Sequence, residues 1–86
     1  MSVTVELYGM ARARAGLAEV TVTARTAREA LEGVVKACPG LAGLLEGGRL
    51  SPLYLLSLDG ERFLAGLDKE LISGARLVLM SADAGG

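Results

Sequence analysis

The chain has 86 residues, a formal net charge of -1 at pH 7, 51% hydrophobic residues and 3% aromatic residues. This length suits one domain with a single compact core. The charges nearly balance and are scattered, unlike the clustered basic surface that binds nucleic acid, and no apolar run approaches the roughly 20 residues that would span a membrane.

Alternating polar and apolar residues predict two strands in the first part of the chain. Residues Val3 to Tyr8 and Ala18 to Thr23 each place their apolar side chains on one face, as half-buried strands do. A loop bounded by Gly9 and Gly16 joins them, so we expect an antiparallel hairpin. Because the alternation starts at Val3, the N-terminus does not resemble a signal peptide.

The next predicted element is a helix that begins at Thr26. The segment Thr26-Ala27-Arg28-Glu29 is a capping box, in which Thr26 accepts from the Glu29 amide and Glu29 reaches back. An apolar stripe of helical spacing follows, made of Leu31, Val34, Val35 and Cys38. Pro39-Gly40 is expected to end the helix. Gly33 inside it costs about 1 kcal/mol relative to alanine, and its missing side chain favours the close approach of a strand.

The remaining elements are predicted to be short. Residues 41–46 favour one further helical turn that ends at Gly47-Gly48. Three more strands are expected, over residues 53–58, 61–64 and 76–80. Asp59-Gly60 indicates a tight turn between the first two of these. Residues 67–72 are expected to form a turn or a short 3₁₀ piece.

This order of elements, β-β-α-β-β-β, predicts an α+β domain in which a mixed sheet of four to five strands packs on one main helix. The first and last strands are expected to pair in parallel at the centre of the sheet, as in the ubiquitin-like β-grasp fold. We therefore expect a β-grasp domain over residues 1–80 and a flexible C-terminal Gly-Gly tail over residues 81–86.

The side chains that usually carry catalysis are scarce. With no histidine and a single cysteine, Cys38, the sequence excludes Ser–His and Cys–His nucleophile pairs and leaves almost nothing to bind zinc. Asp68 and Glu70 are interpreted as solvated turn residues. We expect no metal and no bound cofactor. One cysteine in so small a domain indicates a reducing, cytoplasmic setting rather than a disulfide framework.

Three other side chains are given structural interpretations. Cys38 lies at the end of the apolar stripe and is interpreted as a small core residue. Arg12 and Arg14 fall in the predicted loop after the first strand. They are interpreted as charges that keep the protein soluble, with contact to a partner protein as the alternative.

The end of the chain offers a different kind of chemistry. Gly85-Gly86 follows the last predicted strand by only a few residues, and a six-residue tail can reach about 20 Å. Glycine has no Cβ, so such a tail can enter a narrow channel and leaves the terminal carbonyl open to attack. The Gly86 carboxylate, with Gly85 as its unhindered neighbour, is thus the candidate covalent site. ATP could activate it as an acyl-adenylate, from which a sulfur nucleophile displaces AMP.

A series of short segments covers essentially the whole chain in a recognisable order. They are Tyr8-Gly9-Met10-Ala11-Arg12, Pro39-Gly40-Leu41 with Leu44-Leu45 and Gly48-Arg49-Leu50, Asp59-Gly60-Glu61, the pieces Phe63-Leu64, Gly66-Leu67-Asp68 and Leu71-Ile72-Ser73-Gly74, and finally Gly85-Gly86. Together they resemble the MoaD/ThiS family of ubiquitin-like sulfur carriers. The segment from Pro39 to Leu50 resembles the MoaD-like members. Ser81-Ala82-Asp83 differs from the family, which usually has proline and valine before Ala-Gly-Gly.

The resemblance implies a carrier protein rather than an enzyme. It implies that an E1-like activating enzyme of the MoeB or ThiF type uses ATP to adenylate Gly86, and that the thiocarboxylated chain acts with a MoaE-like large subunit as the small subunit of molybdopterin synthase. Sulfur transfer in thiamine, tRNA thiolation or cysteine synthesis, and conjugation to lysines as a modifier, remain alternatives. An apolar sheet face that includes Leu56, Leu58 and Phe63 is expected to dock the partners.

Overall fold

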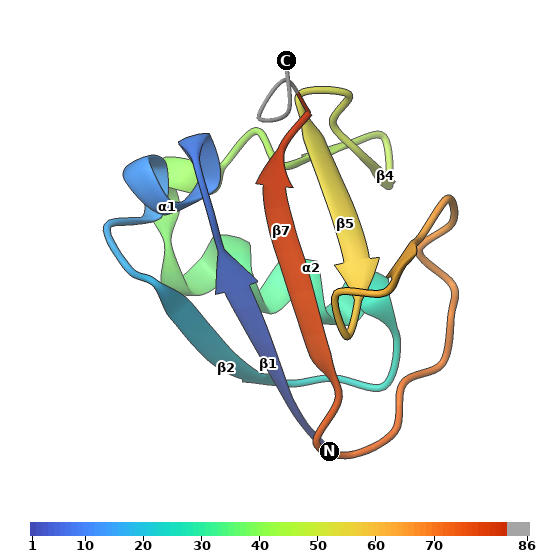
Figure 1. Cartoon of the computed structure of the whole chain (residues 1–86). Helices are drawn as coiled ribbons and strands as arrows, with labels where there is room; N and C mark the ends of the chain where they lie inside the picture. Colours follow the sequence, from blue (N-terminus) through green and yellow to red (C-terminus); the bar gives the residue numbers. More distant parts are fainter. Residues whose placement is uncertain (83–86) are drawn as a thin grey trace.

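A computed structural model describes residues 1–82 as a mixed five-stranded sheet with a helix across one face (Figure 1). The elements in chain order are β1 Ser2–Leu7, α1 Met10–Ala15, β2 Glu19–Thr23, α2 Ala27–Ala37, the 3₁₀ turn η1 Pro39–Leu41, β3 Leu45–Glu46, β4 Arg49–Leu50, β5 Tyr54–Leu58, β6 Arg62–Phe63 and β7 Arg76–Ser81. The large sheet has the strand order β2-β1-β7-β5-β6, and β3 and β4 form a separate hairpin. Among residues 1–82, no helix is long and apolar enough to cross a membrane.

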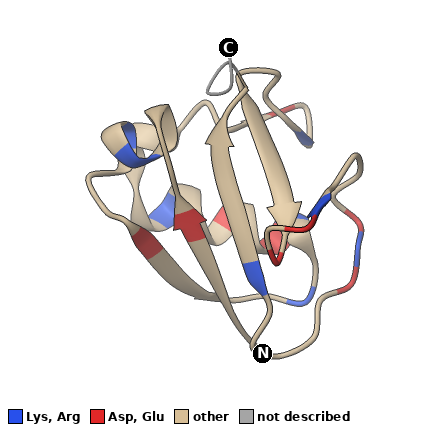
Figure 2. Ribbon diagram, in the orientation of Figure 1, with Lys and Arg blue, Asp and Glu red and all other residues tan. Residues whose placement is uncertain are grey.

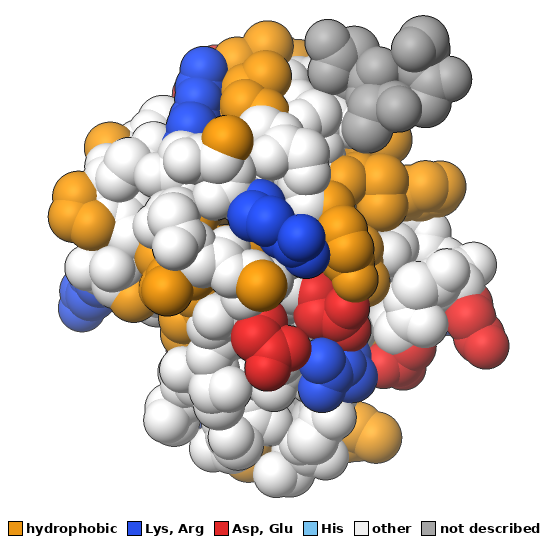
Figure 3. Space-filling model, turned by 60° about the vertical axis from the view of Figure 1, so that its left-hand side comes forward, with side chains coloured by type: hydrophobic (Ala, Val, Ile, Leu, Met, Phe, Trp, Pro, Cys, Tyr) orange, Lys and Arg blue, Asp and Glu red, His pale blue; other side chains and the backbone are white. Residues whose placement is uncertain are grey.

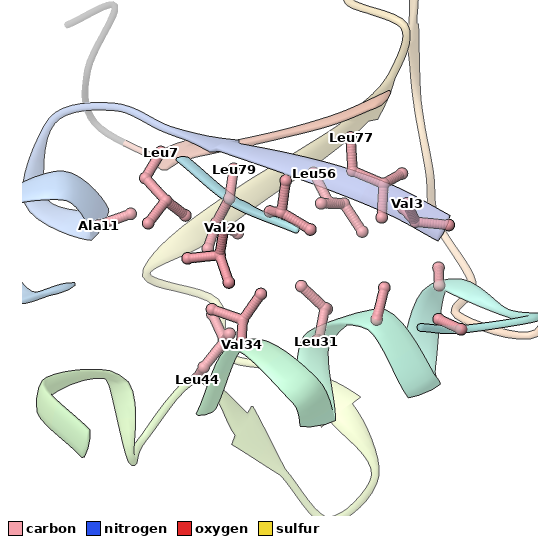
Figure 4. Close-up of a cluster of buried hydrophobic side chains, with 14 of the residues drawn as sticks. Val3, Leu7, Ala11, Val20, Leu31, Val34, Leu44, Leu56, Leu77 and Leu79 are labelled. Atoms are coloured by element: carbon pink, nitrogen blue, oxygen red, sulfur yellow. The ribbon is translucent and has the colours of Figure 1, made fainter. Parts of the chain in front are cut away.

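The predicted central pairing of the sheet is confirmed. β1 runs parallel to β7, with Val5 opposite Leu77 and Leu7 opposite Leu79, and β2 and β5 flank the two strands in antiparallel directions. The four side chains all point toward α2 and are fully buried. Figure 4 shows Leu77 and Leu79 facing Leu31 of α2 across the core. The alternation in β1 thus predicts its inner face, and the register with β1 places Leu77 and Leu79 of β7 on the same face.

The loop predicted between β1 and β2 is instead mostly helical. Residues Met10–Ala15 form α1, which ends at Gly16 in the left-handed conformation with φ 75°. Ala11 is its buried residue, and the Nε of Arg12 donates to the carbonyl oxygen of Leu7 at 2.8 Å. A helix this short is unstable alone, so contacts with the sheet hold it. Arg12 and Arg14 therefore lie on a helix and not in the predicted loop.

Helix α2 begins and ends where the sequence predicts. The Thr26 hydroxyl accepts from the Glu29 amide at 3.2 Å, but the Glu29 carboxylate reaches back to the Arg25 amide at 2.7 Å rather than to Thr26. The close approach expected at Gly33 is confirmed, because a Cβ there would lie 3.0 Å from the Cγ1 of Val22 on β2. Cys38, at the C-terminal cap, is buried as predicted.

The helical turn predicted over residues 41–46 is wrong in its second half. The turn η1 ends at Leu41, after which Leu45–Glu46 and Arg49–Leu50 pair as the β3–β4 hairpin. Gly47 and Gly48 form its turn, with φ values of 58° and 78° that suit glycine. The tight turn expected at Asp59-Gly60 is confirmed by left-handed φ values of 55° and 74°.

The C-terminal boundary also differs from the prediction. Ser81 was expected to begin the tail, but it is the last residue of β7, lies opposite Tyr54 and is buried. The ordered domain thus extends beyond residue 80. Residues 83–86, which include Gly85 and Gly86, lie outside the described residues.

Candidate functional site

The chain leaves the sheet at Ala82, and two surrounding segments, residues 8–10 and Leu53, hold it there. The Ser81 hydroxyl oxygen accepts from the Met10 amide at 2.7 Å, and the Ala82 amide donates to the Leu53 carbonyl oxygen at 2.8 Å. Two residues before Ser81 in the same strand, the Leu79 carbonyl oxygen accepts from the Tyr8 amide at 2.9 Å. We call Met10, Leu53, Ser81 and Ala82 the exit collar. It holds the point in the chain that is followed by Asp83, Ala84, Gly85 and the predicted covalent site, Gly86.

Helix α1 supports one side of the exit collar. An Nη1 of Arg14 donates to the hydroxyl of Tyr54 at 3.0 Å, and Tyr54 is buried opposite Ser81. Met10 and Leu53, with Pro52 and Ala82, line a shallow hollow of about 290 Å³. Arg14, which was predicted to be a solubility charge, thus contributes to the frame around the exit.

The sheet face opposite α2 carries an apolar patch beside the exit collar. We call Tyr8, Leu55, Phe63, Val78 and Met80 the outer patch; Phe63 is 64% exposed and Leu55 is 38% exposed. Leu55 lies opposite Met80 in the register of β5 and β7, and Phe63 lies opposite Ser57, which itself lies opposite Val78. Opposite residues point to the same face, so these side chains form one surface. In Figure 3, apolar side chains gather beside a group of acidic and basic ones.

Two members of the predicted docking face point the other way. Leu56 lies opposite Leu79 and is 1% exposed, and Leu58 lies opposite Leu77 and packs against the core. Only Phe63 of the predicted three is on the outer face. The strand is almost wholly apolar, so its own sequence does not fix which face is buried. The register with β7 does, and it places Leu55 and Met80, which were not among the predicted residues, on the outer face with Phe63.

Charged residues of both signs are spread over the fold (Figure 2), and a small network lies next to the outer patch. Arg76 bonds to Glu6 at 2.8 Å and to Glu19 at 3.0 Å, while the Tyr8 hydroxyl donates to Glu6 at 2.6 Å. The hydrogen bonds from Tyr8 and then Arg76 lower the pKa of Glu6, and the hydrogen bond to Glu6 raises the pKa of Tyr8. The Arg12 guanidinium lies 4.9 Å from the Tyr8 ring centre. These contacts fix the Tyr8 ring at the edge of the patch.

The Glu6 network predicts a pH dependence of stability. Because the folded state lowers the pKa of Glu6 below its ordinary 4.5, this group stabilises the fold above that pH, and the contribution is lost as the pH falls through the folded pKa. We expect Glu6→Gln to be less stable than wild type at pH 7, with the difference shrinking on acidification. Urea unfolding at pH 7 and pH 3 measures this. Glu32→Gln, on the exposed side of α2, is the control, and an equal pH dependence in both variants would contradict the assignment.

A larger hollow adjoins the β5–β6 edge of the sheet and has an ion pair in its lining. This hollow, of about 500 Å³, lies between the β3–β4 hairpin and the β5–β6 edge. Two residues that line this hollow, Arg28 and Asp68, form an ion pair, and Arg28 also donates to the Gly48 carbonyl oxygen at 3.2 Å. Arg28 thus connects α2 to two loops. Within residues 1–82, no three acidic or thiol side chains gather as metal ligands would.

Comparison with solved structures finds similarity over the whole chain. SAMP1 from Haloferax volcanii is 26% identical with a TM-score of 0.84, and 100% of each chain is covered. A chain of the BexX/CysO complex from Amycolatopsis orientalis is 27% identical with a TM-score of 0.80, covering 98% of this chain and 99% of that one. A chain of the complex of subunits 1 and 2 of molybdopterin-converting factor from Helicobacter pylori shares the fold, with 20% identity, a TM-score of 0.69 and 100% coverage of both chains.

No protein-family model and no curated protein matches the sequence. The strand order, the single main helix and the similarity to these solved structures nevertheless agree with the sequence-based expectation. The chain thus has the β-grasp fold and is similar, from end to end, to ubiquitin-like sulfur carriers of the MoaD/ThiS kind.

Proposed function

We propose that the chain is a sulfur carrier whose working group is the α-carboxylate of Gly86. The observation that carries this proposal is the path of β7. This strand lies at the centre of the sheet, is hydrogen-bonded to β1 and β5, and brings the chain to Ala82 at one end of the molecule. Only Asp83, Ala84 and Gly85 separate that fixed point from Gly86. The whole-length similarity to SAMP1 and the CysO complex supports the same role.

The chemistry needs nothing from this chain except an accessible carboxylate. In the proposed reaction, the Gly86 carboxylate attacks the α-phosphorus of ATP, and pyrophosphate leaves. A sulfur nucleophile then attacks the acyl-adenylate and AMP leaves, which gives a thiocarboxylate. An E1-like activating enzyme of the MoeB or ThiF type binds the ATP and supplies the catalytic groups. The chain itself is substrate and subunit.

For the sulfur acceptor, we propose the molybdopterin pathway first. In this role the thiocarboxylated chain joins a MoaE-like large subunit as the small subunit of molybdopterin synthase. The support is the segment from Pro39 to Leu50, which resembles MoaD-like members. It forms η1 and the β3–β4 hairpin. Thiamine synthesis, tRNA thiolation and cysteine synthesis are the alternative acceptor pathways.

A second candidate is a protein modifier joined to lysines through Gly86. The observation in its favour is the 26% identity to SAMP1, a small archaeal modifier protein. Both roles begin with the same adenylate. They differ in the nucleophile that attacks it, which is sulfur in a carrier and a lysine amine in a modifier.

Intact mass spectrometry distinguishes these functions. The chain is incubated with ATP, sulfide and the activating enzyme, and a control omits ATP. A carrier replaces one oxygen with sulfur when AMP is displaced, a gain of about 16 Da. A modifier gives conjugates of higher mass in cells. A chain that shows neither change would contradict both candidates.

The outer patch is proposed to dock the activating enzyme, and one substitution tests this. Phe63 is a large apolar side chain with 64% exposure. Phe63→Asp places a charge where the partner would remove water, so we expect at least tenfold weaker binding, or roughly 1.4 kcal/mol. Titration calorimetry measures it.

Ile72→Asp is the matched control for that test. Ile72 is 79% exposed but lies outside the outer patch, next to Met1 and Arg25. The Ile72→Asp substitution should leave the affinity for the activating enzyme unchanged. Equal affinities for wild type and Phe63→Asp would reject the patch as the docking surface.

A further inference from the structure

Beyond Met80, the last strand is held from both flanks. On one side the Ser81 hydroxyl oxygen accepts from the Met10 amide at 2.7 Å, and on the other the Ala82 amide donates to the Leu53 carbonyl oxygen at 2.8 Å. These contacts join segments about 70 and 30 residues away in the sequence. The end of the strand is therefore anchored by the folded domain, and not simply by its neighbours in the chain.

The Ser81 contact is closely fitted. Its side chain is 4% exposed, and Met10 is the first residue of α1, whose amide has no partner within that helix. The Ser81 hydroxyl oxygen is the acceptor for that amide. Gly9 makes room for it, because a Cβ on Gly9 would lie 2.8 Å from the Ser81 hydroxyl oxygen. Gly9 also has a φ of 57°, which few other residues adopt. The bond thus depends on a residue pair, Gly9 and Ser81.

We propose that Ser81 is a positioning residue, which fixes the origin of the reactive C-terminal segment at Ala82. From there, four residues lead to Gly86 and span at most about 14 Å, against about 20 Å for a tail that began at Ser81. This inference rests on the proposed sulfur-carrier function. It means that the reacting atoms of the activating enzyme must lie within that shorter distance of the exit collar.

A fixed origin makes the reaction sensitive to the length of the segment. When the domain is docked on a partner, the local concentration of the tethered carboxylate falls to near zero if the segment cannot span the distance. If the Ser81 bond fails, the end of β7 can separate and up to two more residues join the segment, adding about 7 Å. Loss of the bond should therefore compensate for a shortened tail.

The test combines deletion of Ala84 with Ser81→Ala. In the wild-type background we expect the deletion to lower kcat/KM for thiocarboxylate formation at least tenfold. In the Ser81→Ala background it should lower kcat/KM less than threefold, because released residues restore the reach. A purely structural role of Ser81 predicts the same fold-loss in both backgrounds, and that result would overturn the proposal.

Hydrogen exchange supplies a readout that does not depend on the reaction. Ser81→Ala should speed exchange at the Met10 and Ala82 amides at least tenfold. The matched control is Ser57→Ala, which removes another 4%-exposed hydroxyl from the sheet but should leave both amides unchanged. Unchanged exchange in Ser81→Ala would also overturn the proposal. If wild type gains no sulfur at all, the proposed function fails, while hydrogen exchange still decides whether Ser81 anchors the strand.

Discussion

Replacing Gly86 with valine is expected to reduce thiocarboxylate formation by about a hundredfold, the size of loss that small misplacements of reacting groups cause. A β-branched side chain next to the reacting carbonyl blocks one face of it and widens the segment that must enter the partner's channel. Adding one residue after Gly86 should be equally damaging, because the activated carboxylate then belongs to another residue. The rate is measured from intact masses over time.

Gly43→Val is the control for this experiment. Gly43 is exposed, and a Cβ there meets no atom within 4 Å. The Gly43→Val variant should form the thiocarboxylate at the wild-type rate. If Gly86→Val or the extended chain gained sulfur as fast as wild type, the proposed role of the terminal carboxylate would be rejected.

Gly40→Ala is expected to cost about 2–3 kcal/mol of unfolding free energy, a large part of the stability of so small a domain. A Cβ on Gly40 would lie 2.0 Å from the carbonyl oxygen of Arg14, which is backbone and cannot rotate away. To relieve the overlap, η1 and α1 must move apart. That movement also pulls Arg14 away from the Tyr54 hydroxyl, so the loss extends to the frame of the exit collar.

Urea unfolding with Gly43→Ala as the matched control tests this prediction. Gly43 is three residues away and has open space around its Cα, so alanine there should leave stability unchanged or raise it by less than about 1 kcal/mol. Equal midpoints for Gly40→Ala and wild type would mean that α1 is not held against η1 in solution.

The central part of the fold could be predicted from the sequence because the patterns that indicate it lie within short segments of the chain. In β1 the sequence alternates and every second residue is buried, so alternation identifies the strand and its inner face. The burial of β7 follows the same pattern, but its residues 77–80 are all apolar, so they indicate a strand without fixing its inner face. Thr26 gives the start of α2 through a side-chain bond that its own neighbours complete. Such features were predicted correctly because they need no knowledge of distant parts of the chain.

The missed features depend on distant contacts. Helix α1 is six residues long, too short to show a helical periodicity, and it is held by contacts with distant segments, such as that between Arg14 and Tyr54. From the sequence alone, Ser81 is assigned to the tail, and only its bond to Met10 and its place in β7 show that it belongs to the domain. The β3–β4 hairpin, by contrast, had a usable signal, because Gly47-Gly48 between two short runs is a two-residue hairpin turn.

The parallel pairing of β1 with β7 has a consequence for protein synthesis. Strand β7 follows the other four strands of the sheet in chain order, yet it lies between β1 and β5 in the middle of the sheet. While a nascent chain is still short of Arg76, β1 and β5 each lack their shared neighbour, and the core residues Leu77 and Leu79 are not yet present. Translation products that end before Arg76 therefore lack the central strand, and we expect them to stay unfolded and open to degradation by cellular proteases.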